Sequence, residues 1–450
     1  MGPLPPAPSP QAERGSGKAA SGRKAITAIG GKRMKLLTFL GVAKYENTLY
    51  TWQDKQVRTR FSPVASCEML KPEEVIVFLT EDAEQNVFSS FKEELGNRAP
   101  VTAKHVPLGK NDQELWKIFE IISDSVRPRE EVAFDITNGL RSFPLIGLMA
   151  AAFLRSGLHV KLKAVLYGAF DIGRQVSPGQ APMFDLSPML SLLEWAAAAD
   201  RFNQTGDSRY LASLVKSHRK SLALAAQNDP SRMDEVNALG SLANQLSTIS
   251  QALHLIRPAQ VMENTVGLEQ RVQKAAPALD RAAAARPFNL LLKTVQENFA
   301  PLGLENPLDE ANLVESLEKQ RLMMEWYIDR EHWVQAVTVA REWLVNWFMI
   351  HLGLDNLKDR DLRKETEERM SAEWKSLQRA RKNDQPPQGL GLLSFQGAEA
   401  ALDLWGKMDV RNDIDHAGWR EQDLEPQDLI KQIQKIVEGI QQLPLPTVLP

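Results

Sequence analysis

The 450-residue chain contains a single cysteine, Cys67, and only 7 histidines. One cysteine excludes an internal disulfide and a zinc site built from several cysteines, and it suits a reducing cytoplasm. No apolar run is long enough to cross a bilayer, so a membrane role is not expected. The formal net charge of -3 gives no global basic field for nucleic acid, although 54 lysines and arginines leave room for a local basic patch.

The first 33 residues are rich in proline, glycine, serine, alanine and basic residues. They lack the compact apolar stretch of a secretory signal, and such a composition is typical of disorder. We therefore expect residues 1–33 to be a disordered or non-native extension, with Met34 as the natural start. The chain as a whole has 43% hydrophobic and 25% charged residues, the balance of a soluble globular protein, and enough length for two or three domains.

Short apolar runs alternate with helical periods over residues 34–186. Five of these runs predict strands. The predicted strands are Lys35–Gly41, Glu74–Thr80, Val101–Val106, Glu131–Thr137 and Val160–Gly168. Helical patterns lie between them, around residues 82–95, 112–126 and 141–155. Strands separated by helices predict an α/β, Rossmann-like domain with a parallel sheet covered on both faces.

The strand signal disappears from Ser187 onward. The segment SPMLSLLEWAAAADRFNQTGD predicts a capped helix that ends near Gly206, and helical patterns continue to the C-terminus. Loop breaks are predicted at residues 306–312 and 382–391. We expect a helical connector over residues 187–304 and an all-α domain over residues 305–450.

Two loops of the predicted sheet carry residues suited to a ligand. Ligands of such sheets bind at the carboxyl ends of the strands, where the strand order reverses. The loop after the first strand offers a lysine and a tyrosine, which can approach a phosphate or stack on a base. The loop after the fourth strand offers a helix N-terminus that attracts anions and an arginine for a bidentate phosphate contact. The candidate ligand-binding residues are Gly41, Lys44, Tyr45, Asp135, Thr137, Asn138, Gly139, Arg141 and Ser142.

The second of these loops also fits an ordinary strand-to-helix turn. In that interpretation Thr137 or Asn138 caps the helix, Gly139 relieves strain and Arg141 is solvated. The sequence leaves the two interpretations equally open. Neither loop contains a GxGxxG or Walker sequence, so neither a dinucleotide nor a triphosphate site is indicated.

A second candidate site lies near the C-terminus, in the stretch DVRNDIDHAGW, which holds Arg411, Asn412 and His416. A histidine with an ordinary pKa of about 6.5 can act as acid or base near neutrality, and arginine grips phosphate with a planar fork. RNA supplies its own nucleophile, the 2′-hydroxyl, so such groups could cleave RNA, but not DNA, without a metal. No second histidine or carboxylate stands at metal-ligand spacing, so no metal site is predicted. On these residues alone, a histidine near a helix start with a solvated arginine is the favoured interpretation.

The chain resembles the CRISPR-associated CARF–HEPN ribonucleases in several segments. These are the opening MKLLTFLG with its tyrosine-containing loop, DITNGLRSFPLIGLMAAAFL, VLYGAFD and FDLSPMLSLLEWAAAADRF. The resemblance runs from Met34 to about Gly206 and returns in the last third of the chain. Asn138 and Leu140 depart from it, since relatives often show histidine and phenylalanine there.

The family's pattern implies roles for particular residues. Its helical HEPN domain carries an arginine, a polar residue, three variable residues and a histidine, which implies that Arg411, Asn412 and His416 are catalytic. A second matching segment, REHWVQAVTVAREWLVNWF, implies Glu342 and Asn346 as supporting residues, against the alternative of surface charges with i,i+4 pairing. The tryptophans are expected to anchor the core, with base stacking by the last two as the lesser possibility. They are Trp343, Trp347, Trp405 and Trp419.

The resemblance implies a cytoplasmic, metal-independent endoribonuclease of a type III CRISPR antiviral system. It would need no cofactor and would be activated allosterically by cyclic oligoadenylate, with cyclic tetra-adenylate as the first choice of ring. It would cut single-stranded RNA by 2′-hydroxyl attack at a composite site in a homodimer or higher homo-oligomer. The alternative is a non-catalytic cyclic-nucleotide sensor that regulates a partner or a promoter. Whether the sensor domain also degrades its messenger is left open.

Overall fold

A computed structural model describes residues 34–176, 179–225, 232–281, 286–384, 386, 391–419 and 424–447. The prediction for residues 1–33 lies outside these residues, as does half of the loop predicted at 382–391. The chain divides into two compact units, Met1–Ser187 and Pro188–Pro450.

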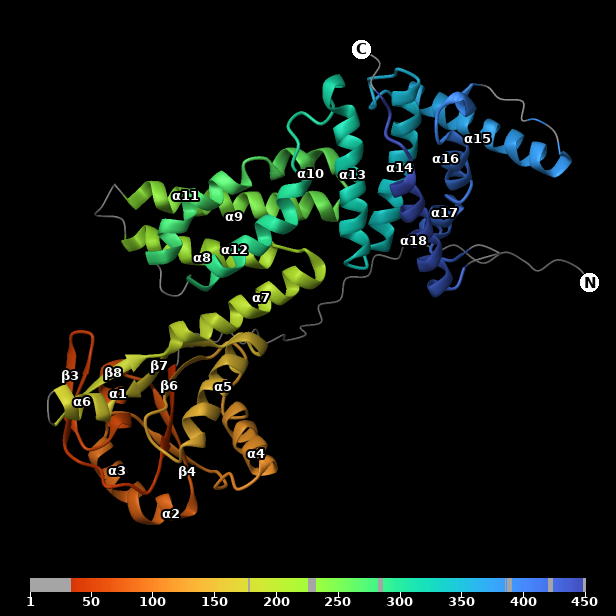
Figure 1. Cartoon of the computed structure of the whole chain (residues 1–450). Coiled ribbons are helices and arrows are strands. Elements are labelled where there is room, and N and C mark those ends of the chain that lie inside the picture. The colour runs from red at the N-terminus through yellow and green to blue at the C-terminus, as the bar shows by residue number, and fades with distance from the viewer. Residues whose placement is uncertain are drawn as a thin grey trace, which may run out of the picture. The chain divides into compact units, whose positions relative to one another are not determined.

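The described part of the first unit contains one sheet of eight strands (Figure 1). The strands are β1 (Met34–Leu40), β2 (Thr48–Trp52), β3 (Lys55–Thr59), β4 (Glu74–Leu79), β5 (Val101–His105), β6 (Glu131–Asp135), β7 (Lys161–Gly168) and β8 (Gln180–Asp185). Their order is β3-β2-β8-β7-β6-β1-β4-β5. The strand order reverses at β1, which pairs in parallel with β4 on one side and with β6 on the other.

The five predicted strands are present as β1, β4, β5, β6 and β7, and they pair with one another in parallel. The prediction of a purely parallel sheet is nevertheless wrong at one edge. There the hairpin β2–β3 pairs in parallel with β8, and β8 runs antiparallel to β7. The sheet is therefore mixed, and the hairpin and β8 were not expected from the sequence.

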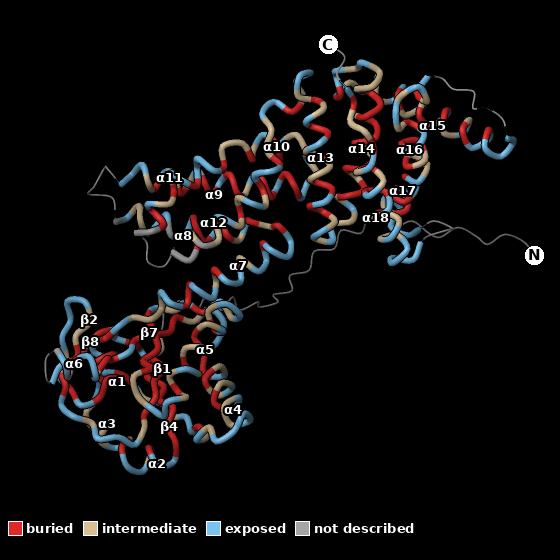
Figure 2. The backbone as a smooth tube through the Cα atoms, in the orientation of Figure 1, coloured by how far each residue is buried: buried red, intermediate tan, exposed pale blue. Residues whose placement is uncertain are grey.

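Helices cover both faces of the sheet. They are α1 (Ser62–Leu70), α2 (Glu81–Ala83), α3 (Ser89–Leu95), α4 (Asp112–Ser123), α5 (Ser142–Gly157) and α6 (Phe170–Val176), with a π-helical turn over Glu84–Phe88 between α2 and α3. Along β1, Leu36 and Leu40 join a buried cluster that includes Phe91 of α3. Phe39 points to the other face, where its ring lies 5.7 Å from that of Phe143 in α5. This alternation is the reason why the central strands are buried throughout (Figure 2).

The second unit is helical (Figure 1). Its longer helices are α7 (Ser191–Thr205), α8 (Arg209–Ala225), α9 (Met233–His254), α10 (Pro258–Thr265), α11 (Leu268–Arg281), α12 (Arg286–Phe299), α13 (Leu313–Ile328), α14 (Trp333–His351), α15 (Arg360–Asn383), α16 (Ala398–Trp405), α17 (Asp409–Asp415) and α18 (Pro426–Gln442). One hydrophobic cluster extends from Trp195 in α7 to Leu443 after α18. The helices on either side of residue 305 thus share a core.

The tryptophans of this unit were expected to be core anchors. Trp343 and Trp347 are fully buried, as predicted, and Trp405 is partly buried. Trp419 is 91% exposed, so that prediction is wrong. The residue lies in the loop after α17, where Ala417 and Gly418 have positive φ and the helix has ended. Among the described residues, none of the helices is long and apolar enough to span a membrane.

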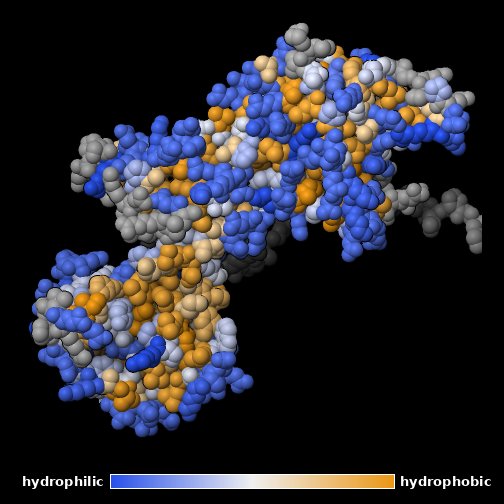
Figure 3. All heavy atoms as spheres, in the orientation of Figure 1, coloured by the Kyte–Doolittle hydropathy of each residue, from blue (hydrophilic) through white to orange (hydrophobic). Residues whose placement is uncertain are grey.

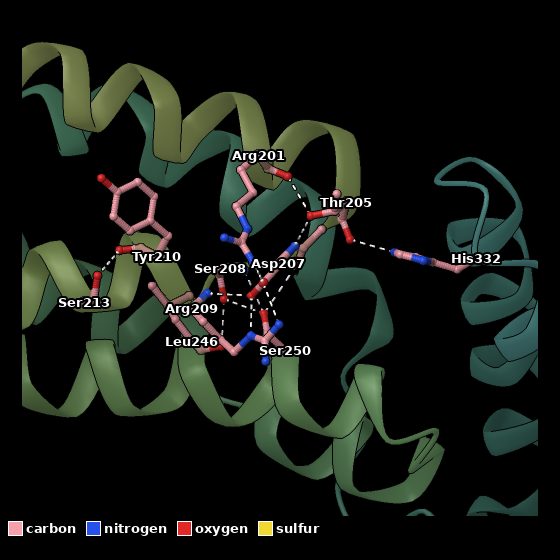
Figure 4. A network of polar contacts seen from close by, with 11 residues as sticks. Arg201, Thr205, Asp207, Ser208, Arg209, Tyr210, Ser213, Leu246, Ser250 and His332 are labelled. Atoms are coloured by element: carbon pink, nitrogen blue, oxygen red, sulfur yellow. Dashed lines mark hydrogen bonds and ion pairs between the residues drawn. The ribbon is translucent and has the colours of Figure 1, made fainter. Parts of the chain in front are cut away.

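Helix α7 ends at Gly206, as predicted, and its end is fixed on other helices. Gly206 has a φ of +66°, and a Cβ atom there would overlap the ring of Trp326 in α13. The backbone oxygen of Thr205 accepts a hydrogen bond from Nε2 of His332, 2.9 Å away, directly before α14 (Figure 4). The C-terminal end of α7 is therefore held against both α13 and the start of α14.

Asp207 then joins α7 to α8. Its Oδ2 accepts a hydrogen bond from Arg201 at 2.8 Å, and its Oδ1 accepts one from Nε of Arg209 at 2.8 Å (Figure 4). Burial opposes the charge of Asp207, but the hydrogen bonds from Arg209 and the charges of both arginines outweigh it and lower the pKa to about 2. The neighbouring Ser208 donates to the backbone oxygen of Leu246 in α9 at 2.7 Å.

Candidate functional site

A pocket of about 380 Å³ lies at the carboxyl ends of β1, β6 and β7, where the strand order reverses. The position is the one that the sequence predicted. The lining residues are Gly41, Val42, Ala43, Lys44, Tyr45, Glu46, Thr48, Arg60, Thr137, Asn138, Gly139, Leu140, Tyr167, Gly168, Phe170, Asp171, Gly179 and Gln180. We refer to it as the sensor pocket, after the role that the resemblance implies for this domain.

The floor of the sensor pocket is formed where two loops touch through their backbones. A Cβ atom on Gly41 would lie 3.1 Å from Cα of Gly139. Gly139 has a φ of +106°, and a Cβ atom there would lie 3.0 Å from the Phe143 ring. The positive φ and the close contacts of Gly139 therefore favour glycine there, and the missing side chain of Gly41 lets the two loops touch.

Tyr45 closes the loop after β1 onto itself. Its hydroxyl donates to the backbone oxygen of Gly41 at 2.9 Å and accepts from the Gly41 N–H at 3.2 Å. One face of its ring packs on Phe61, with the ring centroids 4.6 Å apart. Tyr45 thus shapes the pocket wall as predicted for a lining residue, while its hydroxyl is already engaged.

Asp135 lies beneath the sensor pocket and organises it. The side chain is fully buried and accepts hydrogen bonds from Ser66 Oγ at 2.6 Å, Ser62 Oγ at 3.3 Å and the Thr137 N–H at 3.0 Å. Burial raises the pKa of Asp135, although these hydrogen bonds favour the carboxylate. Ser62 in turn accepts a hydrogen bond from the Asn138 amide at 2.8 Å, so the buried carboxylate positions the turn above it.

The structure brings six of the nine predicted ligand-binding residues together on the pocket wall. They are Gly41, Lys44, Tyr45, Thr137, Asn138 and Gly139. Asp135 supports them from below, whereas Arg141 and Ser142, at the start of α5, are not among the lining residues. Thr137 is also used internally, because its hydroxyl accepts the Gly168 N–H at 2.8 Å.

Several lining residues were missed in the sequence. Arg60 and Thr48 come from the β2–β3 hairpin and its end, and Gln180 from β8. These elements were not recognised as strands, so nothing placed their residues near β1.

The second candidate site is carried by α17, which packs against α14 and α18. Val410 and Asp413 face inward and are buried, whereas Asn412 is exposed. His416 directly follows the helix, is exposed, and its backbone N–H bonds the Asn412 oxygen at 3.0 Å. The predicted residues Arg411, Asn412 and His416 thus lie on one short helix and its end.

Local contacts hold these side chains. Nη1 of Arg411 lies 3.0 Å from Oδ2 of Asp415, and the Asn412 amide donates to Asp409 at 3.1 Å. Asp413 accepts the Leu424 N–H at 3.2 Å, which ties α17 to the residues before α18. In the single chain, Arg411 is therefore paired with a carboxylate one turn away.

Glu342 and Asn346 of α14 are joined by one arginine of α15. Arg363 donates to Asn346 Oδ1 at 2.7 Å and bonds Glu342 Oε2. Glu342 also accepts from Arg341 at 2.7 Å. Among the described residues, no hydrogen bond or ion pair joins Glu342 or Asn346 to Arg411, Asn412 or His416. The geometry therefore gives the two residues a role in fixing α15 on α14.

Arg341 links three helices. It bonds Glu367 of α15 at 2.7 Å, and its guanidinium lies 5.4 Å from the centre of the Trp405 ring in α16. Its side chain is partly buried and forms part of the packing around α14. In the described part of the chain, no cluster of three or more histidine, cysteine, aspartate or glutamate residues could hold a metal ion.

The first unit is similar to the CARF domains of CRISPR-associated proteins. The family model of the CARF domain of the CRISPR system endoribonuclease Csx1 matches residues 35–171. The model of the second domain of the CRISPR-associated protein MJ1674 matches residues 191–302. The expected resemblance to CRISPR-associated CARF proteins is therefore confirmed over residues 35–171, and the region that follows is mostly helical.

Two particular proteins are similar to the chain. The CRISPR-associated protein MJ1674 of Methanocaldococcus jannaschii is 30% identical over 154 residues, which are 34% of this chain and 24% of that protein. The chain thus matches about a quarter of the length of this curated relative. The structure of Enterococcus italicus Csm6 bound to cyclic hexa-2′-fluoro-hexa-dAMP aligns with a TM-score of 0.39 and 10% identity, over 91% of this chain and 93% of that one.

Proposed function

We propose that the protein is a metal-independent endoribonuclease of a type III CRISPR antiviral system, activated by cyclic oligoadenylate. The observation that carries the proposal is the pairing of a CARF domain with a separate helical unit that displays Arg411 and His416 at one exposed helix end. The CARF domain recognises cyclic oligoadenylate, and the helical unit cuts single-stranded RNA in the cytoplasm. No cofactor enters the reaction.

The sensor pocket suits a cyclic oligonucleotide. It lies where the loops after β1 and β6 meet at Gly41 and Gly139, and Lys44 adds a cation at the rim that suits a phosphate. About 380 Å³ is too small for a whole ring of several nucleotides, so one protomer would hold only part of it. A ring with two-fold symmetry would fill two such pockets, and cyclic tetra-adenylate is our first choice.

An apolar stripe on α5 supports assembly with a second copy. Leu145, Met149 and Phe153 are spaced four apart on one face and are 67%, 60% and 48% exposed. Trp116 of α4 extends the stripe through Phe119, whose ring lies 5.3 Å from that of Phe153. Figure 3 shows apolar side chains gathered over this part of the first unit. A self-complementary stripe of this kind fits a two-fold homodimer.

In the dimer, two Arg411–His416 pairs would meet at one composite site. His416 acts as base or acid on the 2′-hydroxyl and the leaving 5′-oxygen, while Arg411 stabilises charge on the scissile phosphate. Asn412 orients the histidine or the RNA backbone, and Glu342 and Asn346 support the site indirectly by fixing α15 on α14. The 2′-oxygen bonds to phosphorus as the 5′-oxygen leaves, so the products carry 2′,3′-cyclic phosphate and 5′-hydroxyl ends.

Cleavage of a fluorogenic RNA, with EDTA present and with cyclic tri-, tetra- or hexa-adenylate, tests the proposal. One ring should stimulate the wild type, and His416→Ala should lose at least about a thousandfold in rate, because both proton-transfer roles disappear. Leu145→Glu should shift the protein towards monomer in light scattering and lose stimulation. Cleavage that survives in His416→Ala would remove the proposed site.

The second candidate function is a non-catalytic sensor that regulates a partner or a promoter. It is favoured by the Arg411–Asp415 ion pair, which leaves the arginine engaged within its own helix. This function predicts that the protein binds the ring but cleaves no RNA. If incubation with the protein converts the ring to a linear product, the sensor domain also degrades its own activator.

A further inference from the structure

Arg60 is a cation of the sensor pocket that the sequence did not single out. Among the described lining residues, Lys44 is the other cation, and Glu46 and Asp171 supply carboxylates. Lys44 is 90% exposed, and its amino group lies 4.0 Å from Glu46. Lys44 therefore extends into solvent, whereas Arg60 is fixed by contacts with α3.

Glu94 of α3 anchors Arg60 at two points. Oε1 accepts the Arg60 backbone N–H at 2.8 Å, and Oε2 accepts Nε–H at 2.8 Å. Oε1 also accepts the hydroxyl of Thr59. Burial opposes the charge of Glu94, but these hydrogen bonds outweigh it and lower its pKa. The carboxylate therefore fixes both the end of the hairpin and the direction of the arginine.

The outer end of Arg60 remains available. The side chain is 46% exposed, and neither terminal amino group forms a hydrogen bond with a described residue. The guanidinium carbon lies 5.4 Å from the centre of the Phe61 ring, and Phe61 packs on Tyr45 of the loop after β1. A column of Arg60, Phe61 and Tyr45 thus borders the pocket.

We propose that Arg60 is a phosphate-binding and specificity-determining residue of the sensor pocket, pre-oriented by Glu94 to contact a phosphodiester of the activator. This inference rests on the proposed sensing of cyclic oligoadenylate. The planar guanidinium presents its two unused amino groups to phosphate oxygens, and its fixed Nε spares the cost of ordering the side chain. In a two-fold dimer each protomer contributes one Arg60 to one ring.

The alternative is that Arg60 merely fastens the hairpin to α3. Three variants separate the two roles. Arg60→Ala removes both the anchor and the pocket cation, whereas Glu94→Gln weakens the same anchor and keeps the cation. Arg98→Ala is the matched control, because Arg98 is 42% exposed and donates its Nε–H to Glu68 at 2.7 Å but does not line the pocket.

Binding of cyclic tetra- and hexa-adenylate, and of a linear tetra-adenylate, is measured by calorimetry on the full chain at several salt concentrations. Arg60→Ala should weaken binding of the preferred ring about ten- to a hundredfold, the loss expected for charge-assisted hydrogen bonds. The salt dependence of its affinity should also become shallower, because a phosphate contact is gone. Glu94→Gln should lose only a few-fold, and Arg98→Ala should bind like the wild type.

Equal losses in Arg60→Ala and Glu94→Gln, with an unchanged salt dependence, would overturn the proposal and leave Arg60 a structural role. That outcome would leave the sensor function intact, since the wild type still binds the ring. A wild type that binds no ring would overturn both. Preference of the wild type, but not of Arg60→Ala, for a ring over the linear molecule would support the assignment of specificity.

Discussion

Replacement of Asp207 by asparagine is expected to destabilise the helical unit by about 2 kcal/mol at neutral pH. Its carboxylate binds Arg201 and Arg209, and its pKa of about 2 lies below the ordinary value of 3.8. One pKa unit corresponds to about 1.4 kcal/mol, so the difference between pKa values of 3.8 and about 2 corresponds to a free energy of about 2 kcal/mol. The side chain is only 12% exposed, so solvent screens little of this.

The sign of the pH dependence follows from the lowered pKa of Asp207. The stabilisation is fully present above the ordinary pKa of 3.8 and is lost as the pH falls from there towards 2. The wild type should therefore lose its advantage over the variant in this acid range. Urea denaturation at several pH values, with hydrogen exchange of the α7–α8 peptides, measures both effects.

Asp200→Asn is the matched control for Asp207→Asn. Asp200 lies on α7, which leads into the Asp207 junction, and among the described residues its hydrogen bonds come from the exposed Gln204, at 3.0 Å. Its replacement should change stability by less than about 0.5 kcal/mol. If Asp207→Asn is as stable as the wild type at neutral pH, or if the difference between them is the same near pH 3, the electrostatic account of this junction is wrong.

Gly206→Ala should cost at least about 2 kcal/mol, because a left-handed φ is combined with overlap on Trp326. Gly353→Ala should cost only about 1 kcal/mol, since Gly353 shares the positive φ but has open space around it; equal thermal shifts would contradict this. Asp415→Asn frees Arg411 from an exposed ion pair worth up to about 1 kcal/mol, so it should raise ring-stimulated RNA cleavage by up to about fivefold. A fall in rate in that variant would show that Asp415 assists the site instead.

The parallel core of the sheet could be predicted because its strands carry a strong local signal. Val75–Leu79 and Val132–Phe134 are continuous apolar runs, buried on both faces. The hairpin gave no such signal. Its turn places Gln53 at a φ of +54°, where glycine, asparagine or aspartate would be the recognisable residue. Strand β8 contains Pro182, which argues against a strand in sequence, yet the strand forms between β2 and β7.

The residues of the candidate sites also differ in whether the sequence could predict their position. Gly41 and Gly139 could be predicted because they follow adjacent strands of a sheet whose order reverses there. Arg60 could not, because it reaches the pocket only after an unexpected hairpin has folded beside β8. The bond from Arg363 to Glu342 likewise depends on how α15 packs on α14, which no local pattern encodes.

Activation requires that the ring bind the active dimer more tightly than the inactive one, and the two copies of Arg60 bear on how this is achieved. Moving an equilibrium from 1:99 to 99:1 takes about a 10⁴-fold difference in affinity between the states. Suppose that each Arg60–phosphate contact forms only in the active state and raises the affinity for the ring about tenfold. Two symmetric contacts then favour the active state about a hundredfold, which is half of the required free-energy difference. Arg60→Ala would then lower the maximal rate at saturating ring as well as the affinity. An unchanged maximal rate would show that Arg60 binds phosphate equally in both states, so that the discrimination must come from the loops at Gly41 and Gly139.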